Sequence, residues 1–513
     1  MESRTLGIMD AILRQLRDIL SEINALEGAS HVLTWDQFTY MPTSGASARG
    51  RQASALKRVI HEKSTSADLG KLLDAAANFL PQMDPDSDDA SLIRVARRDF
   101  ERASRVPDDF VERFSSHTSV SYMAWAEARA ADDFSVVAPF LQRSIDLSRE
   151  YSGFFPGAAH VADPLIEHSD PGMSVATIGP LFGELHRGLL PIVRDIAARS
   201  QPEDGFLYHH YPKKRQIDFG AMVARRFGYD FERGRQDMAL HPFSITLGVD
   251  DVRITTRVKE DDLWEGLSST LHEAGHGMYE QGIDVMLDGT PLASGASSGV
   301  HESQSRLWEN LVARSLPFWE CFFPLLQKQF PESLQGVSVD AFYRAINRVE
   351  PTFIRTDSDE VTYNLHVMLR FDLEVQLLEG KLSVHDLPEA WNERMHQDLG
   401  VCPESPNYGV LQDVHWYCDH VGGAFQGYTL GNLMSAQFFA AALRDHPEIS
   451  AEMALGRFNL LHGWLTRKIY RHGRKFSDDK LVLRATGQPL TVTPFLDYLK
   501  NKYSALYGLA ANA

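Results

Sequence analysis

Apolar residues recur along most of this 513-residue chain with the spacing of amphipathic helices. Near the N-terminus, apolar positions three and four residues apart place one stripe along a long first helix. This stripe consists of Met9, Ile12, Leu13, Leu16, Leu20 and Ile23. Similar stripes run through much of residues 91–150, 174–200, 303–330, 360–400 and 430–475. Because helical periodicity dominates, the pattern predicts a mainly α-helical fold.

Residues 241–258 (HPFSITLGVDDVRITTRV) have a different pattern. Two runs rich in β-branched and aromatic residues flank a Gly-Val-Asp-Asp turn, which predicts a hairpin or small sheet. Such a sheet could align a peptide substrate through its backbone hydrogen bonds, or it could be purely structural. The sequence favours neither role over the other.

The breaks between the helical stripes are short and rich in Pro, Gly and Asp. A chain of 513 residues exceeds the usual size of one compact core, so its length suggests two or three subdomains. No break is long enough to be an interdomain linker, and no repeat of fixed period occurs. The sequence therefore assigns no boundary within the chain.

The charge and the cysteine content argue against several classes of protein. With 51 basic and 69 acidic residues, the formal net charge of −18 argues against a general binder of nucleic acid or membrane surfaces. The three cysteines form no Cys-x-x-Cys pair, which argues against a disulfide framework or a thiolate zinc site. No apolar stretch approaches the roughly 20 residues that span a bilayer, and the first residues lack the uninterrupted apolar core of a signal peptide. We therefore expect a cytoplasmic protein.

Residues 261–281 have the pattern of a helix that carries a metal site. Acidic residues suit its N-terminus, an apolar stripe follows, and Gly282 can terminate it. His272 and His276 are rotated by about 40° and separated by about 6 Å along the axis, so both imidazoles can reach one metal ion. Glu273 lies about 100° round from His272, beside such an ion, where a carboxylate can take a proton from water. The alternative is an ordinary helix with two surface histidines.

A hydrolytic zinc site normally has three protein ligands and one open position. The candidate for the third ligand is Glu302, in a segment (SSGVHESQSRLWEN) that Ser297 or Ser298 could cap as a second helix. The alternative is an ordinary Glu302–Arg306 ion pair on a solvated helix face. His301 is a rival ligand or a group that supports the ligands from behind. From the residues alone these alternatives stay open.

A series of motifs in a fixed order makes the chain resemble the carboxypeptidase Taq family of metallocarboxypeptidases. LHEAGHGMYEQG (271–282), followed by SGVHESQSRLWEN (298–310), carries the resemblance at the metal site. HVLTWDQFTYMPTSGASARGRQ (31–52) is similar to the opening signature of the family. The other matching signatures are HPF (241–243), DVRIT (251–255), IRTDSDEVTYNLH (354–366) and GVLQDVHW (409–416).

The resemblance implies a predominantly α-helical, butterfly-shaped fold with a deep cleft, usually assembled as a homodimer. Residues 1–513 would then form one metallocarboxypeptidase unit, with two helical subdomains around the cleft. The resemblance also implies that His272, His276 and Glu302 bind the metal and that Glu273 is the catalytic base. Zinc (Zn2+) is the usual metal, and cobalt (Co2+) serves some members. The implied substrates are peptides with a free C-terminus, from which single amino acids are removed.

Two other activities remain as alternatives. The first is an oligopeptidase or peptidyl-dipeptidase on the same helical scaffold. The second is a non-catalytic scaffold that keeps only a metal site. Glu273 argues against the second, because a protein without activity has no reason to keep the base.

A carboxypeptidase must recognise a free carboxylate, and the planar fork of an arginine can bind both of its oxygens. Arg355 in IRTDSD and Arg253 in DVRIT are the candidates, and the resemblance favours Arg355. Each could instead form a structural ion pair with an aspartate of its own segment. His415 or Tyr428 could donate a hydrogen bond to the oxyanion of the tetrahedral intermediate, and His241 could shape the same cleft. A structural role fits each of these three residues equally well.

Two departures from the family pattern concern this substrate site. Ser358 stands where the family usually has Ala, which is a mild change that should leave Arg355 in place. Residues 417–432 (YCDHVGGAFQGYTLGN) differ from the Gly-Tyr-Phe-Pro sequence that in this family usually precedes the Tyr-Thr-Leu-Gly stretch. The altered loop weakens the prediction for Tyr428 and for any specificity that the loop contributes.

Overall fold

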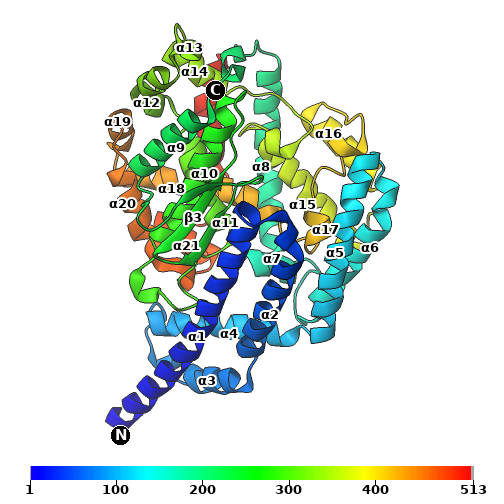
Figure 1. Cartoon of the computed structure of the whole chain (residues 1–513), viewed down its shortest axis with the longest axis vertical. Helices are drawn as coiled ribbons and strands as arrows, with labels where there is room; N and C mark the ends of the chain where they lie inside the picture. The colour runs from blue at the N-terminus through cyan, green and yellow to red at the C-terminus, as the bar shows by residue number, and fades with distance from the viewer. Residues whose placement is uncertain (1, 510–513) are drawn as a thin grey trace.

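The computed structural model describes residues 2–509, and helices make up most of this part of the chain (Figure 1). The helices of the N-terminal half are α1 (Glu2–Thr39), α2 (Ala46–Ser64), α3 (Ala67–Ala77), α4 (Asp88–Arg105), α5 (Asp108–Ala131), α6 (Ala138–Gly153), α7 (Asp163–Ser169), α8 (Val175–Ala197) and α9 (Lys213–Phe227). Those of the C-terminal half are α10 (Leu263–Gln281), α11 (Ser298–Arg306), α12 (Leu316–Gln329), α13 (Pro331–Leu334), α14 (Val339–Ile346), α15 (Tyr363–Glu379), α16 (Leu387–Leu399), α17 (His415–Cys418), α18 (Gln426–Asp445), α19 (Ile449–Ala454), α20 (Asn459–Lys468), α21 (Asp478–Thr486) and α22 (Thr493–Tyr507). The prediction of a mainly α-helical fold is confirmed.

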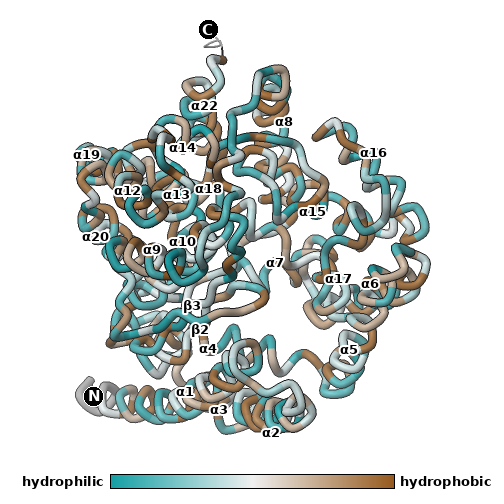
Figure 2. The backbone as a smooth tube through the Cα atoms, turned by 45° about the horizontal axis from the view of Figure 1, so that its top comes forward, coloured by the Kyte–Doolittle hydropathy of each residue, from teal (hydrophilic) through white to brown (hydrophobic). Residues whose placement is uncertain are grey.

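The N-terminal helices form a layer of their own. The apolar stripe expected on the first helix is buried in α1, where Leu13, Leu16 and Leu20 pack against α3 and α4. Ser66 and Ser87 start α3 and α4, because each side chain accepts a backbone N–H of the first helical turn. In Figure 2, α1, α2 and α3 lie side by side below β2 and β3.

The buried apolar side chains form two clusters. The smaller cluster joins α1, α3 and α4 to loop residues such as Val249 and Leu292. The larger one extends through the rest of the described chain, from Phe110 onward. A cavity of about 560 Å³ lies between the N-terminal helices and the sheet, lined by Gly28, His31 and Thr246 among others. We propose that the two clusters mark the two helical subdomains expected around a cleft.

The small sheet contains three strands, β1 (Gln236–Met238), β2 (Ser244–Gly248) and β3 (Asp251–Thr256), in the order β1-β3-β2. The expected hairpin is present as the antiparallel pair β2–β3, and β1, which the sequence pattern did not indicate, adds in parallel to β3. Helix α1 covers the outer edge of β2: His31 Nδ1 donates to the carbonyl of Thr246, and a Cβ at Gly28 would lie 2.6 Å from the carbonyl of Leu247. These two carbonyls are therefore not free to pair with a peptide.

Helix α10 lies at the centre of the molecule, in contact with α9, β3 and α11 (Figure 1). Helix α11 in turn packs closely along α18. The pair is close because Gly431 of α18 lies against Glu302, where a Cβ would come within 2.7 Å of the glutamate Cβ. In residues 2–509 no helix is long and apolar enough to cross a membrane.

Candidate metal centre

Helix α10 carries the first two candidate ligands. It begins at Leu263, two residues later than the segment expected from the sequence, with Asp262 as its N-cap: the Asp262 carboxylate accepts the N–H groups of Trp264 and Glu265. Gly282 ends the helix as expected. Gly275 is needed inside the helix, because a Cβ there would lie 2.7 Å from the backbone of α11. The short Gly275 contact brings the two helices close enough to share a metal site.

Helix α11 supplies the third candidate ligand. Ser297 caps it by accepting the N–H of Val300, which decides between the two serines considered as caps. Glu302 is buried, and its Oε2 lies 3.7 Å from Nε2 of His272 and 3.5 Å from Nε2 of His276. The three ligand atoms all lie within 4.8 Å of one another. Two imidazole nitrogens and one carboxylate oxygen are the donor set of many hydrolytic zinc sites.

The Glu302–Arg306 ion pair of the alternative interpretation is present, but on a buried helix face and not on a solvated one, and it leaves one carboxylate oxygen for a metal ion. While Oε2 faces the histidines, Oε1 accepts a hydrogen bond from Nε of Arg306 at 2.6 Å. Burial raises the pKa of Glu302, but the charges of Arg306 and of the two histidines outweigh it and leave the pKa well below the usual range. Glu302 is therefore ionised, as a ligand must be, and the ion pair with Arg306 orients it.

Both histidines are held by hydrogen bonds on the side away from Glu302. Nδ1 of His272 donates to Glu309 at 2.9 Å, from a π-helical turn (Leu307–Val312) that continues α11. Nδ1 of His276 meets Nδ1 of His301 at 2.5 Å, and Nε2 of His301 contacts Glu280 at 2.8 Å. Nε2 of each ring faces the site. Against the effect of burial, the charges of Glu302 and Glu309 raise the pKa of His272 to about 9, so a metal ion would replace the Nε2 proton of this ring on binding. His301 thus lies behind the candidate ligand His276 and is not one of the three converging side chains.

Removal of the support behind His272 is expected to weaken metal binding. We predict that Glu309→Ala lowers zinc affinity by about 10- to 100-fold, because His272 loses the acceptor that fixes its tautomer and ring orientation. Competition with a chromogenic chelator measures this affinity. Glu320→Ala, at an exposed position on α12, is the matched control and should bind zinc as the unmodified protein does. Equal affinities for the two variants would contradict the assigned role of Glu309.

Glu273 has the position and the acidity of a general base. It follows His272 directly on α10, and its side chain is buried. Burial raises the pKa of Glu273 to about 7, against the opposing effect of the His272 charge. A divalent cation held by the neighbouring ligands would lower this pKa again. The carboxylate can therefore accept a proton near neutral pH and release it again.

Arg355 lies behind the site in a buried charge network. Its guanidinium donates to Oδ1 of Asp413 at 3.0 Å and to the hydroxyl of Tyr363 at 2.9 Å. Arg370 donates to the other oxygen of Asp413 at 2.5 Å. Two guanidinium groups thus share one carboxylate, which leaves one positive charge without a partner in the network. The ion pairs with Asp357 or Asp359 that the sequence allowed are not formed.

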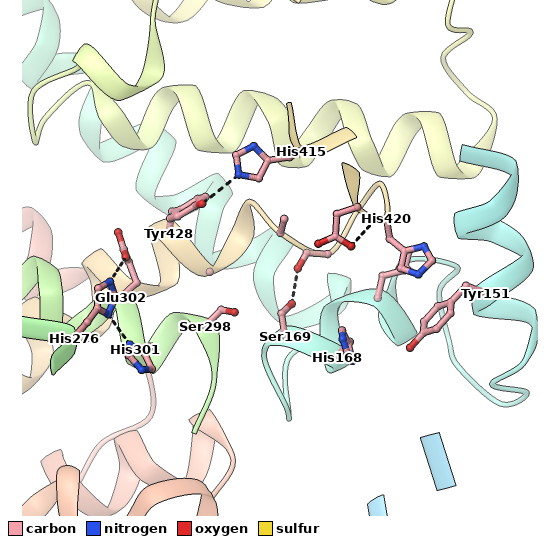
Figure 3. A pocket seen from close by; sticks show the side chains of 15 residues that line it. Tyr151, His168, Ser169, His276, Ser298, His301, Glu302, His415, His420 and Tyr428 are labelled. Atoms are coloured by element: carbon pink, nitrogen blue, oxygen red, sulfur yellow. Dashed lines mark hydrogen bonds and ion pairs between the residues drawn. The ribbon is translucent and has the colours of Figure 1, made fainter. Parts of the chain in front are cut away.

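Tyr428 and His415 line the cavity that opens onto the metal site. This cavity has a volume of about 420 Å³ and also includes His276 and Glu302 in its lining. Figure 3 shows Tyr428 directed at His415, with the hydroxyl 3.4 Å from Nε2 of the ring. Burial raises the pKa of Tyr428 to about 12 and lowers the pKa of His415 to about 4. At neutral pH the tyrosine is therefore a protonated donor and the histidine is uncharged.

The far wall of the cavity comes from the altered loop and from α6 and α7. His420 lies there beside Tyr151 and His168 (Figure 3). The ring of His420 stacks on that of Phe114 with 4.0 Å between centroids. Residues 417–432 thus contribute to the wall opposite the candidate metal site, and Tyr428 faces the cavity.

Two of the expected substrate residues lie away from this cavity. Arg253 forms a two-fold ion pair with Asp251, at 2.8 Å for each hydrogen bond, and its guanidinium stacks 4.3 Å from the ring of Trp35 in α1. His241 is exposed before β2. Neither residue belongs to the lining of the cavity at Glu302. Of the two arginine candidates, only Arg355 is near the site.

The sequence did not indicate several of the supporting residues. Glu309 follows Glu302 by seven residues, which is two helical turns, so its position on the same face was a usable signal. Arg370 and Tyr363 gave no such signal, because Arg370 meets Asp413 and Tyr363 meets Arg355 only in the tertiary fold. Glu280 gave no signal in the sequence either, because it is linked to His276 only through the hydrogen bonds of His301.

Comparison with known proteins gives consistent matches over nearly the whole chain. The family model described as carboxypeptidase Taq (M32) metallopeptidase matches residues 15–503. A thermostable carboxypeptidase 1 from Thermus thermophilus is 40% identical over 509 residues, which cover 97% of this chain and 99% of that protein. Carboxypeptidase 1 from Bacillus subtilis is 34% identical over 495 residues, which cover 96% of this chain and 98% of that protein.

A solved structure agrees with these sequence matches. The crystal structure of an M32 carboxypeptidase from Deinococcus radiodurans R1 is similar with a TM-score of 0.95 and 48% sequence identity. The similarity covers 97% of this chain and 100% of that chain. The resemblance of the motifs therefore extends to the whole fold.

Proposed function

The chain belongs to the carboxypeptidase Taq (M32) family of metallopeptidases, and on that premise we propose that it is a zinc carboxypeptidase whose metal is held by His272, His276 and Glu302. It is a metallocarboxypeptidase, a hydrolase that removes single amino acids from the C-terminus of peptides. The family and the names of the relatives do not favour the alternative of an oligopeptidase or peptidyl-dipeptidase. One observation carries the assignment of the site: the three donor atoms converge within 4.8 Å.

The donor set supports zinc as the metal. Two neutral imidazoles and one carboxylate suit Zn2+, and Co2+ can take the same ligands. When bound there, the cation acts as a Lewis acid that polarises the scissile carbonyl and makes a water molecule more acidic. The Glu302–Arg306 and His272–Glu309 hydrogen bonds keep the ligands in place without it. The site is therefore preorganised for a metal.

Glu273 moves the proton in the proposed mechanism. Its carboxylate takes a proton from the attacking water and then gives it to the nitrogen of the leaving amino acid. The hydroxyl of Tyr428 lies across the cavity as a donor for the oxyanion, because its high pKa keeps it protonated. His415 holds this hydroxyl in place from the far side.

Arg355 provides the preference for a free C-terminus. The network of Arg355, Arg370 and Asp413 has one positive charge in excess, and a substrate carboxylate would neutralise it. The guanidinium of Arg355 lies 5.0 Å from the ring of Tyr428, so it is adjacent to the cavity that holds the scissile bond. A carboxylate bound there places the last peptide bond next to the ligands.

A pair of otherwise identical peptides tests the reaction class. With the zinc-loaded or cobalt-loaded protein, the peptide with a free C-terminus should lose single residues in sequence, and its C-terminally amidated twin should remain intact. Mass spectrometry over a time course resolves the successive products. Cleavage of both peptides at the same internal bond would instead identify an oligopeptidase or peptidyl-dipeptidase.

We also propose that the protein is a homodimer in the cytoplasm. The dimer follows from the family resemblance. The compartment is supported by Cys321, Cys402 and Cys418, which are all free thiols, the last two exposed. Sedimentation velocity should give twice the mass of the 57.6 kDa chain, and a species of single-chain mass at micromolar concentration would exclude the dimer.

A further inference from the structure

Two buried carboxyl groups meet beside the first turn of α11, the helix that carries Glu302. Asp170 directly follows α7, and Asp478 is the first residue of α21; both are fully buried. Gly299 faces both groups, because a Cβ on it would lie 3.1 Å from Oδ1 of Asp170 and 3.6 Å from Oδ2 of Asp478. The pair therefore contacts the backbone of the ligand-bearing helix.

Asp170 has the surroundings of an ionised carboxylate. Its Oδ1 accepts the N–H of Gly299 at 2.6 Å, and its Oδ2 accepts the side-chain amide of Gln426 at 3.0 Å. Gln426 is the first residue of α18, so the carboxylate lies at the N-termini of two helices. The partial positive charge of both termini stabilises an anion at this position. Asp170 is therefore the charged member of the pair.

Asp478 has the opposite surroundings. Among the residues that the structure describes, no formed hydrogen bond reaches either of its oxygens. The titratable groups that face it are Asp170, Glu167 near the end of α7, Asp479 on its own helix and Tyr279 of α10. None of these is a cation, and an unpaired buried carboxylate is strongly unfavourable. A neutral carboxylic acid avoids this penalty.

Ser297 links the pair to α11. Its Oγ accepts the N–H of Val300 at 3.0 Å as the N-cap of the helix. The same hydroxyl lies near the carboxyl groups of both Asp170 and Asp478. It opposes the effect of burial, which raises the pKa of Asp170 to about 6 and that of Asp478 well above its usual range. A serine hydroxyl has one proton to donate but can accept two hydrogen bonds. If both carboxylates were ionised, the single hydroxyl proton could serve only one of them. With one proton added to the pair, Asp170, Asp478 and Ser297 can all be joined by hydrogen bonds.

We infer that Asp478 is a protonated carboxylic acid at neutral pH, that its proton is directed through Ser297 to the ionised Asp170, and that this shared proton holds the first turn of α11. Glu302 lies one turn further along the same helix, so the pair stabilises the turn from which this ligand extends, and Asp478 itself takes no part in metal binding. It touches neither the ligands nor the cavity. The inference rests on the proposed function only through the role of Glu302 as a ligand.

A proton fits this place better than a metal ion. The N–H of Gly299 and the amide of Gln426 point at the pair, and both would face a cation with their positive ends. Within residues 2–509, three or more metal-ligating side chains come together only at His272, His276 and Glu302.

The pKa of Asp478 has the direction that the inference requires. Burial raises it well above its usual range, and the charge of Asp170 raises it further. A carboxyl whose pKa is higher in the folded than in the unfolded protein keeps its proton on folding. The stability gained in this way is fully present below the unfolded pKa of about 4 and is lost as the pH rises towards the folded pKa. Asparagine at this position would abolish this dependence.

Asp478→Asn in the metal-loaded protein tests the inference, because an asparagine amide donates a hydrogen bond as the neutral acid does. We expect unchanged zinc content and unchanged peptidase activity at pH 7. Relative to the unmodified protein, the thermal midpoint of the variant should rise by about 1 °C for each pH unit between pH 5 and 8. Asp497→Asn, at an exposed position on α22, is the matched control and should follow the unmodified protein.

Asp170→Asn should have a different effect, because the amide places a donor against the Gln426 donor. We expect about tenfold weaker zinc binding for this variant at all pH values, as for loss of other groups that support ligands. The inference is overturned if Asp478→Asn loses zinc to the same extent, or if its midpoint follows the unmodified protein across the pH series. Failure of the proposed function would appear differently, as absence of carboxypeptidase activity in the unmodified protein.

Discussion

Glu273→Gln is expected to keep its zinc and to lose about 10²- to 10⁴-fold in kcat, which is the usual contribution of a general base. Glutamine has nearly the shape of glutamate, so α10 and its two histidines should keep their places. The amide cannot take a proton from water or pass one to the leaving nitrogen. Zinc content by atomic absorption, together with kcat on a short peptide, separates the two effects.

The matched control for this variant lies just outside the helix. Asp261→Asn removes one exposed negative charge beside the start of α10 without touching the site. It should retain both zinc and turnover. Near-normal turnover in Glu273→Gln would remove Glu273 from the mechanism. Loss of zinc in that variant would mean that the residue supports the metal rather than the proton transfer.

The parts of this site that the sequence predicted are those set by local geometry. His272, Glu273 and His276 belong to one helix, and their directions follow from a rotation of about 100° per residue. The same local rules placed the apolar stripe of α1 and the β2–β3 hairpin. Even the exact N-cap of α11 was among the two serines that the sequence offered. Local periodicity therefore predicts the elements and the relative positions of the first two candidate ligands.

What the sequence could not predict depends on close approach in three dimensions. The ion pair of Glu302 with Arg306 and its proposed role as a ligand looked like alternatives, but one carboxylate oxygen contacts Arg306 and the other faces the histidines. That arrangement requires α11 to be held between α10 and α18, where Gly275 and Gly431 leave no room for a side chain. A glycine signals such a contact, but the sequence does not say with which element.

The two arginine candidates show the same limit. Both Arg253 and Arg355 have aspartates nearby in sequence, and the chemistry of their side chains is identical. In the fold, Arg253 pairs with its own neighbour Asp251 and stacks on Trp35. Arg355 forms no ion pair with the aspartates next to it in sequence and binds Asp413 instead. The difference arises from which segment packs against each arginine, and this is a property of the whole fold.

Loss of Arg355 is expected to have the second large effect. Truncation of one partner in a buried charge pair typically costs about 2–5 kcal/mol, which corresponds to a fall of about 30- to 5,000-fold in kcat/KM. We expect Arg355→Ala to show this fall on peptides with a free C-terminus. Its activity on the amidated twin, which has no carboxylate to bind, should change little. The variant should therefore lose the preference for the free acid.

Two further variants decide whether this effect comes from carboxylate binding. Arg355→Lys keeps the positive charge but not the planar fork, so it should retain part of the preference for the free acid. Arg253→Ala, the matched control, removes an arginine that stacks on Trp35 away from the cavity and should retain all of it. Zinc content and thermal midpoint identify any variant that fails to fold. If Arg253→Ala loses the preference and a folded Arg355→Lys keeps it in full, the carboxylate is bound at the sheet and not beside Tyr428.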